Sequence, residues 1–153
     1  MPGKYSRPVS RPRVTSHASI IVASRSPPRS LSGSLSHQRG VLESVIPAGH
    51  FDGIFANASL FHVPCQELPR VLSELHAALK PDGVLFSSNP RENNEEGWNR
   101  GRYGAYHDLE SWRAFLEKAA FSELEHYYRP PGLPREQQPW LASVWRRKSA
   151  ATY

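Results

Sequence analysis

Hydrophobic and polar residues alternate in blocks along the chain after residue 45, and the blocks predict strands and helices in turn. The apolar centre of FDGIFANAS, residues 54–56, suits a buried strand that ends at the polar Asn57. Residues 66–79 predict a helix, because their apolar side chains recur every three or four positions and share one face. Lys-Pro-Asp-Gly then ends this helix, and VLFSS at 84–88 predicts the next strand.

The later blocks predict a loop, a second helix and two more strands. Residues 89–106 are polar, with glycines and aromatic residues, and predict one long loop. Asp108 is the expected N-cap of a helix with an apolar face. Residues 121–129 and 140–147 predict two strands with no helix between them, hence an antiparallel hairpin. The fold class is therefore α/β, with a mainly parallel sheet that ends in a C-terminal antiparallel hairpin.

Charge divides the 153 residues into two parts. The whole chain has a formal net charge of +5, but residues 1–44 alone carry seven Lys and Arg against one acid, Glu43. Residues 45–153 are nearly neutral, with 12 Lys and Arg against 13 acids. The first part is also rich in Ser and Pro, and such a composition buries too little apolar surface to offset the entropy cost of ordering. We predict a mostly disordered tail at 1–44, in which ASIIVA (18–23) is either a strand or a short apolar patch.

The composition excludes several classes of protein. The single cysteine, Cys65, excludes a disulfide scaffold within the chain and a multi-cysteine zinc site, and no metal is predicted. No apolar run approaches the ~18 residues that a membrane span needs, so we expect no membrane and a cytoplasmic location. Nucleic acid is not favoured as a partner, because the basic charge lies in a tail whose only aromatic residue is Tyr5.

Two stretches of the second part resemble a known family. FDGIFANASLFHVPCQELPRVLSELHAALKPDGVLFSS resembles the second half of class I S-adenosylmethionine-dependent methyltransferases, where an FD-led strand precedes a helix that ends in L-K/R-P-G-G. EGWNRGRYGAYHDLESWRAFLEKAAF resembles small bacterial and fungal methyltransferases with EGW…GRY and a helix ending in AGF. Asp82 and Ala120 stand where the family has glycine. The resemblance implies a Rossmann-like sheet and S-adenosylmethionine as cofactor.

The family's cofactor motif has no counterpart in the first part of the chain. That motif is a GxGxG loop after the first strand, followed by an acid at the end of the second. Residues 1–44 contain only Gly3, Gly33 and Gly40, which are too far apart. We therefore expect residues 45–153 to be the C-terminal half of a methyltransferase domain, truncated and with little or no cofactor binding. A frameshift or a mis-joined exon is our hypothesis for residues 1–44.

The resemblance assigns candidate site residues to the loops. Asn57, Ala58 and Leu60 would line the methionine side of the cofactor, largely through backbone groups, and His62 in the same loop is a candidate base. The alternatives are a turn residue for Asn57 and a packed loop histidine for His62. In the long loop, the candidate substrate-binding residues are Trp98, Arg102, Tyr103 and Tyr106. An aromatic and basic loop suits an apolar or anionic small molecule, or else its rings simply pin the loop.

Three functions follow from these observations. The first is methyl transfer to an unknown, small-molecule acceptor by a truncated family member. The second is a non-catalytic protein that binds nucleic acid or another partner through its basic tail. The third is an orphan half-domain: without a preceding strand, the strand at 51–56 would be an exposed apolar edge. Pairing with ASIIVA, homo-association or aggregation would each cover that edge.

Overall fold

Five strands form one mixed sheet. The structure, a computed structural model, describes residues 20–23 and 48–149. The strand order across the sheet is β1-β2-β3-β7-β6, where the strands are β1 (Ile20–Ala23), β2 (Phe51–Asn57), β3 (Leu79–Pro90), β6 (Phe121–Arg129) and β7 (Trp140–Arg147). All the strands predicted from the sequence are present, and the last one has the predicted bounds. Apart from β1, the tail predicted at residues 1–44 lies outside the described residues.

The expectation of a mainly parallel sheet is not confirmed. Among the described strands, β2 and β3 pair in parallel, and the other three neighbouring pairs are antiparallel. The reason is the direction of β7: it lies between β3 and β6 and runs against both, so the C-terminal hairpin, at one end of the sheet, accounts for two of the antiparallel pairs. At the other edge, β1 pairs antiparallel with β2.

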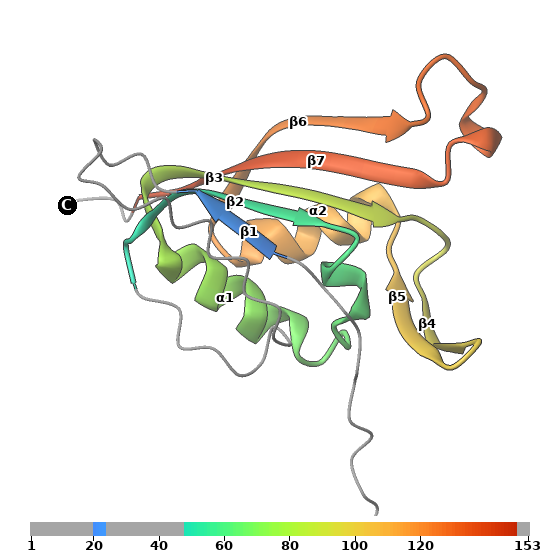
Figure 1. The fold of residues 1–153 in the computed structure, drawn as a ribbon, viewed down its shortest axis with the longest axis horizontal. Helices are drawn as coiled ribbons and strands as arrows, with labels where there is room; N and C mark the ends of the chain where they lie inside the picture. Colours follow the sequence, from blue (N-terminus) through green and yellow to red (C-terminus); the bar gives the residue numbers. More distant parts are fainter. Residues whose placement is uncertain (1–19, 24–47, 150–153) are drawn as a thin grey trace, which may run out of the picture.

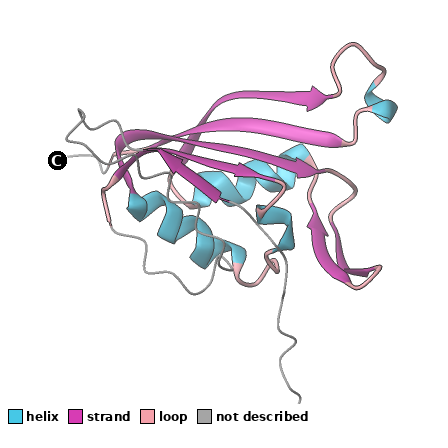
Figure 2. Ribbon diagram, in the orientation of Figure 1, coloured by secondary structure: helices cyan, strands magenta, loops and turns pink. Residues whose placement is uncertain are grey.

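Two helices cover one face of the sheet, as Figures 1 and 2 show from the same side: α1 (Leu68–Ala78) and α2 (Leu109–Lys118). The predicted helix at 66–79 is confirmed to within two residues at each end, and its apolar stripe is buried. Asp108 caps α2 as predicted, because its carboxylate accepts the Ser111 N–H at 2.8 Å. The core between helices and sheet includes Leu72, Leu85 and Trp145.

The tight turn in the first residues of β3, directly after α1, depends on one glycine. Asp82 lies in the left-handed region (φ 62°), and Gly83 follows it. A Cβ on Gly83 would lie 2.8 Å from the Lys80 carbonyl oxygen, closer than real Cβ atoms come. The chain can therefore turn this tightly into β3 because this position has no side chain.

The predicted long loop at 89–106 is wrong, since most of it is a hairpin. Strands β4 (Glu95–Asn99) and β5 (Arg102–Tyr106) pair antiparallel with a two-residue turn, Arg100-Gly101. Both turn residues have positive φ, 49° and 77°, the conformation that matches strand twist in tight hairpins. Two of the aromatic residues that we expected either to bind substrate or to pin the loop are cross-strand neighbours, since Trp98 pairs with Tyr103.

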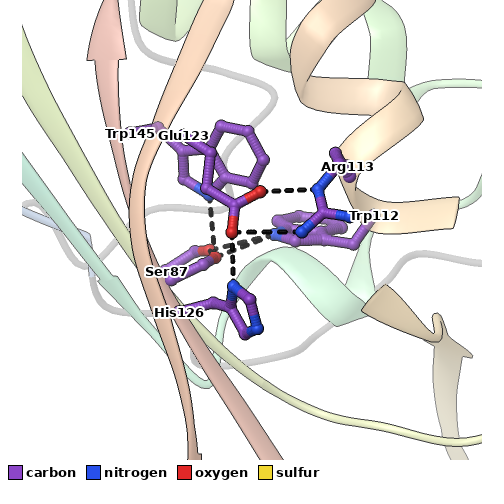
Figure 3. A network of polar contacts seen from close by, with 7 residues as sticks. Ser87, Trp112, Arg113, Glu123, His126 and Trp145 are labelled. Carbon is purple, nitrogen blue, oxygen red and sulfur yellow. Dashed lines mark hydrogen bonds and ion pairs between the residues drawn. The ribbon is translucent and has the colours of Figure 1, made fainter. Parts of the chain in front are cut away.

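A buried polar network fastens α2 to the centre of the sheet (Figure 3). The indole N–H of Trp112 lies 3.2 Å from the hydroxyls of both Ser87 on β3 and Ser143 on β7. The two hydroxyls are 3.0 Å apart, and the Trp145 indole donates to Ser143. All four side chains are almost completely buried. Each polar atom has a partner, so the network adds no desolvation penalty of an unpaired group.

A second contact in Figure 3 joins α2 to β6 near the edge of the sheet. The Arg113 guanidinium donates to the Glu123 carboxylate at 2.6 Å, and His126 contacts the same carboxylate. The hydrogen bond from Arg113 is the main cause of a lowered pKa of Glu123. The carboxylate therefore stays charged and keeps α2 aligned along β6.

The sheet face opposite the helices carries an aromatic stack. Phe55 and Phe86 are cross-strand neighbours whose rings are stacked. Their centroids are 4.6 Å apart, and the ring planes are nearly parallel, at 6°. Phe55 remains 43% exposed. Parallel strand pairs are normally covered on both faces, so this open face departs from the usual α/β arrangement.

Replacing Trp112 with Phe should destabilise the protein by about 1–3 kcal/mol, because two buried serine hydroxyls lose a donor and the smaller ring leaves a gap. The measurement is the free energy of unfolding from urea titration. Trp98→Phe is the control, since Trp98 is 57% exposed. Equal losses for the two variants would contradict a special role for the network.

Homo-association through an exposed β2 edge stays a prediction. In the structure β1 pairs with β2 and covers that edge, so the test must first uncover it. Proline at both Ile21 and Val22 removes two adjacent N–H groups, of which one points toward β2 in an antiparallel pair. We expect the native chain to elute as a monomer in size-exclusion chromatography and the double variant to associate. A variant that remains monomeric would show that the uncovered edge does not drive association.

Candidate functional site

The loop after β2 forms the floor of the candidate site. It leaves the sheet at Ala58, whose φ of 52° lies in the left-handed region and whose N–H donates to the Ser88 carbonyl at 2.8 Å. A short 3-10 turn, η1 (Leu60–His62), follows and leads to α1. Because β2 and β3 are parallel, this loop lies beyond their carboxyl ends, where open α/β sheets bind ligands.

The β4–β5 hairpin folds over this loop. His62 Nδ1 lies 2.7 Å from the Tyr103 carbonyl oxygen, and the Cys65 N–H donates to the Glu96 carboxylate at 2.8 Å. The Phe61 and Tyr106 rings are 5.9 Å apart. Segments about forty residues apart in the sequence are thus joined by contacts at three points.

His62 is held as a neutral imidazole whose other nitrogen, Nε2, forms no hydrogen bond with the part of the chain that the structure describes. A carbonyl oxygen only accepts hydrogen bonds, so Nδ1 carries the proton that is donated to Tyr103. Burial lowers the pKa of His62, and the charge of Arg102 lowers it further. Nε2 is therefore unprotonated at neutral pH, which is the state that a general base requires.

Cys65 and His107 meet underneath the hairpin. The thiol lies 3.9 Å from His107 Nε2. Burial, with a smaller contribution from the Glu96 carboxylate, raises the pKa of the Cys65 thiol to about 11. Burial also lowers the pKa of His107, whose ring packs against Trp112 and Phe115. Both groups are thus neutral at pH 7, and the contact lacks the thiolate that nucleophilic catalysis needs.

The three residues predicted to line the cofactor have different environments. Asn57 is exposed at the end of β2, and Ala58 is half-buried. Leu60 is 1% exposed and belongs to the hydrophobic core, while its carbonyl accepts the Val63 N–H at 3.1 Å. Only the side chain of Asn57 is therefore readily accessible from solvent.

The four predicted substrate residues all lie on the hairpin. Trp98 and Tyr106 line a cavity, whereas Arg102 and Tyr103 do not. Tyr103 packs against Trp98, and its hydroxyl donates to Glu96. Sequence reasoning missed Glu96 and His107, which connect the hairpin to Cys65. The only local signal for the hairpin was the pair Arg100-Gly101 between Trp98 and Tyr103, and the segment was interpreted as a loop.

Within residues 20–23 and 48–149, no group of three or more His, Cys, Asp or Glu side chains could hold a metal ion. The helices in these same ranges are too short or too polar to cross a membrane.

Comparison with known proteins identifies one family. The model of the methyltransferase domain matches residues 15–87, slightly under half of the chain. This match begins upstream of the boundary that we expected at residue 45, and it ends within β3. No curated protein matches the sequence.

Several solved methyltransferases share the fold. The Burkholderia thailandensis 1,6-didemethyltoxoflavin-N1-methyltransferase is 22% identical, with a TM-score of 0.59 over 67% of this chain and 46% of that one. A methyltransferase from Mesorhizobium loti is 16% identical, with a TM-score of 0.56 over 70% of this chain and 66% of its own. A putative methyltransferase from Listeria monocytogenes is 10% identical, with a TM-score of 0.62 over 79% of this chain and 73% of its own.

These findings confirm the resemblance to class I S-adenosylmethionine-dependent methyltransferases. At identities this low, the structural likeness shows the fold alone. The chain spans about half of the first solved structure and two thirds of the second.

Glu96→Gln should make Cys65 more reactive, because removing the carboxylate removes a charge and a hydrogen bond that raise the thiol's pKa. Since Cys65 is the only cysteine, iodoacetamide labelling followed by mass spectrometry reports on it alone. We expect slow labelling of the native chain at about pH 8 and faster labelling of the variant. Glu110→Gln on α2 is the control, and an equal rate in both variants would contradict this account of the pKa.

Proposed function

We propose that this chain, a relative of the class I S-adenosylmethionine-dependent methyltransferases, corresponds to the half of that domain that faces the methyl acceptor. The observation that carries the proposal is the unit β2–α1–β3. The family model runs through this unit to residue 87, and its two strands pair in parallel as an open α/β sheet requires. In this proposal the domain spans residues 45–153, and the acceptor is a small molecule.

Two observations support a small acceptor. The β4–β5 hairpin contacts the loop after β2 at three points and covers it, which leaves less room for a large acceptor than an open loop would. The Burkholderia relative was solved with 1,6-didemethyltoxoflavin and S-adenosylhomocysteine bound, so the shared fold accommodates a small molecule beside the cofactor product in that protein. In our proposal His62 Nε2 takes the proton from the acceptor's N–H or O–H group.

The described residues do not fit the cofactor by themselves. The Ala58 N–H and the Leu60 carbonyl, which would face the cofactor, already form hydrogen bonds within the chain, and the Leu60 side chain is in the core. The glycines of residues 1–44 are too widely spaced for a loop that lets the backbone approach a ligand. We therefore derive no step through S-adenosylmethionine, and methyl transfer by this chain stays a proposal for the whole domain.

Titration of the full chain with S-adenosylmethionine in a calorimeter tests this account. We expect no saturable heat, because the backbone groups on the methionine side are already occupied and the glycine-rich loop is missing. The Burkholderia thailandensis methyltransferase, which was solved with S-adenosylhomocysteine bound, is the positive control. Micromolar binding by this chain would show that residues outside the described ranges supply a cofactor site, and would overturn the half-domain proposal.

A further inference from the structure

A cavity of about 390 Å³ lies beside the β4–β5 hairpin, and neither the family match nor the candidate base accounts for it. It is large enough for a small organic molecule. Its walls come almost entirely from β4 and from the residues that flank the hairpin: Glu92, Glu95, Glu96, Gly97, Trp98, Asn99 and Tyr106.

The charge of this cavity is negative. Three of its seven lining residues are glutamates, and none is basic. Glu96 is engaged by the Cys65 N–H and the Tyr103 hydroxyl, whereas Glu92 and Glu95 form no ion pair within the described residues. The nearby Arg91 points elsewhere, since its guanidinium donates to the carbonyls of Gln138 and Arg135 in the β6–β7 connection.

The aromatic walls are held in place. The Trp98 ring packs edge-on against Tyr103, with centroids 5.8 Å apart at 76°, yet 57% of the residue is exposed. The Tyr106 ring folds back over Gly104: a Cβ there would lie 2.7 Å from the ring's Cζ and hydroxyl oxygen. Tyr106 also packs against Phe61. The rings are thus fixed before a ligand arrives, which lowers the entropy cost of binding.

We propose that this cavity binds an organic cation of the alkylammonium class. Such a cation gains from the electron-rich faces of Trp and Tyr and from nearby carboxylates, and its alkyl groups replace water against the rings. A bare metal ion fits less well, because no three acidic, His or Cys groups converge among the described residues. An apolar or anionic ligand, which the sequence suggested, would face uncompensated carboxylates.

The assignment goes beyond the proposed function. It concerns binding at the hairpin and does not depend on whether the chain holds a cofactor or transfers a methyl group. Its test therefore needs neither cofactor nor methyl transfer. Whatever the calorimetric experiment with S-adenosylmethionine shows, the cation-binding proposal is tested separately.

The test is a titration of the full chain with tetramethylammonium chloride at constant ionic strength, followed by the indole N–H signals in ¹H–¹⁵N spectra. The chain has four tryptophans, and loss of one signal in Trp98→Phe assigns the reporter. We expect a saturable shift of the Trp98 signal. Pivalate and tert-butanol, with similar shape but negative or no charge, should cause no saturable shift. Equal shifts with tert-butanol, or none with tetramethylammonium, would overturn the proposal.

A charge-matched pair of variants tests the carboxylates. Glu92→Gln with Glu95→Gln should weaken tetramethylammonium binding by roughly threefold to tenfold. Glu110→Gln with Glu117→Gln on α2 changes the net charge equally but leaves the cavity intact, and we expect no weakening. Equal weakening by both pairs would mean that overall charge attracts the cation, and the assigned site would be wrong. Unchanged spectra away from the hairpin show that each variant is folded.

Discussion

The buried indole N–H of Trp112 is the constraint on which the rest of the structure depends. A buried donor without an acceptor is costly, so Trp112 must reach Ser87 and Ser143, which lie side by side on β3 and β7. That requirement fixes the position of α2 against the sheet. It also fixes the start of the helix, because the Asp108 cap lies just one turn before the indole.

The start of α2 also fixes the position of the β4–β5 hairpin. The Asn94 side chain accepts the Asp108 N–H and donates to the Asp108 carboxylate, both at 3.0 Å, so the segment before β4 is tied to the segment after β5. His107, next to the cap, is buried under the hairpin against Cys65. The hairpin then borders two environments. Where it meets the loop, the pKa shifts favour neutral His62, Cys65 and His107. The cavity beside it is lined by carboxylates, including Glu96, which also accepts the Cys65 N–H.

The sequence predicted the elements whose side chains have a clear periodicity. The stripe of α1, the Asp108 cap and the strand at 140–147 were each visible as local patterns, and all are confirmed. The β4–β5 hairpin was missed because its turn is Arg100-Gly101 rather than a common turn pair, and because its strands, EEGWN and RYGAY, lack a regular alternation of apolar and polar residues. The mixed direction of the sheet was missed because strand order is a long-range property: Ser87 and Ser143 are neighbours across fifty-six residues. For the site, the loop at Asn57–Pro64 lies beyond the carboxyl end of β2 as expected, and the roles of its residues stay a prediction. The acid-lined cavity was not predicted, because it depends on how the hairpin folds.

The central place of β7 has a consequence for synthesis on the ribosome. β7 is the last of the described strands to be made, yet it pairs with both β3 and β6. Until it leaves the ribosome, β3 has one open side, Ser87 lacks Ser143, and Trp112 has only half of its acceptors. Such long-range pairing must follow the closure of a long loop, which slows folding. The described sheet therefore cannot close until β7 has been made and has left the ribosome.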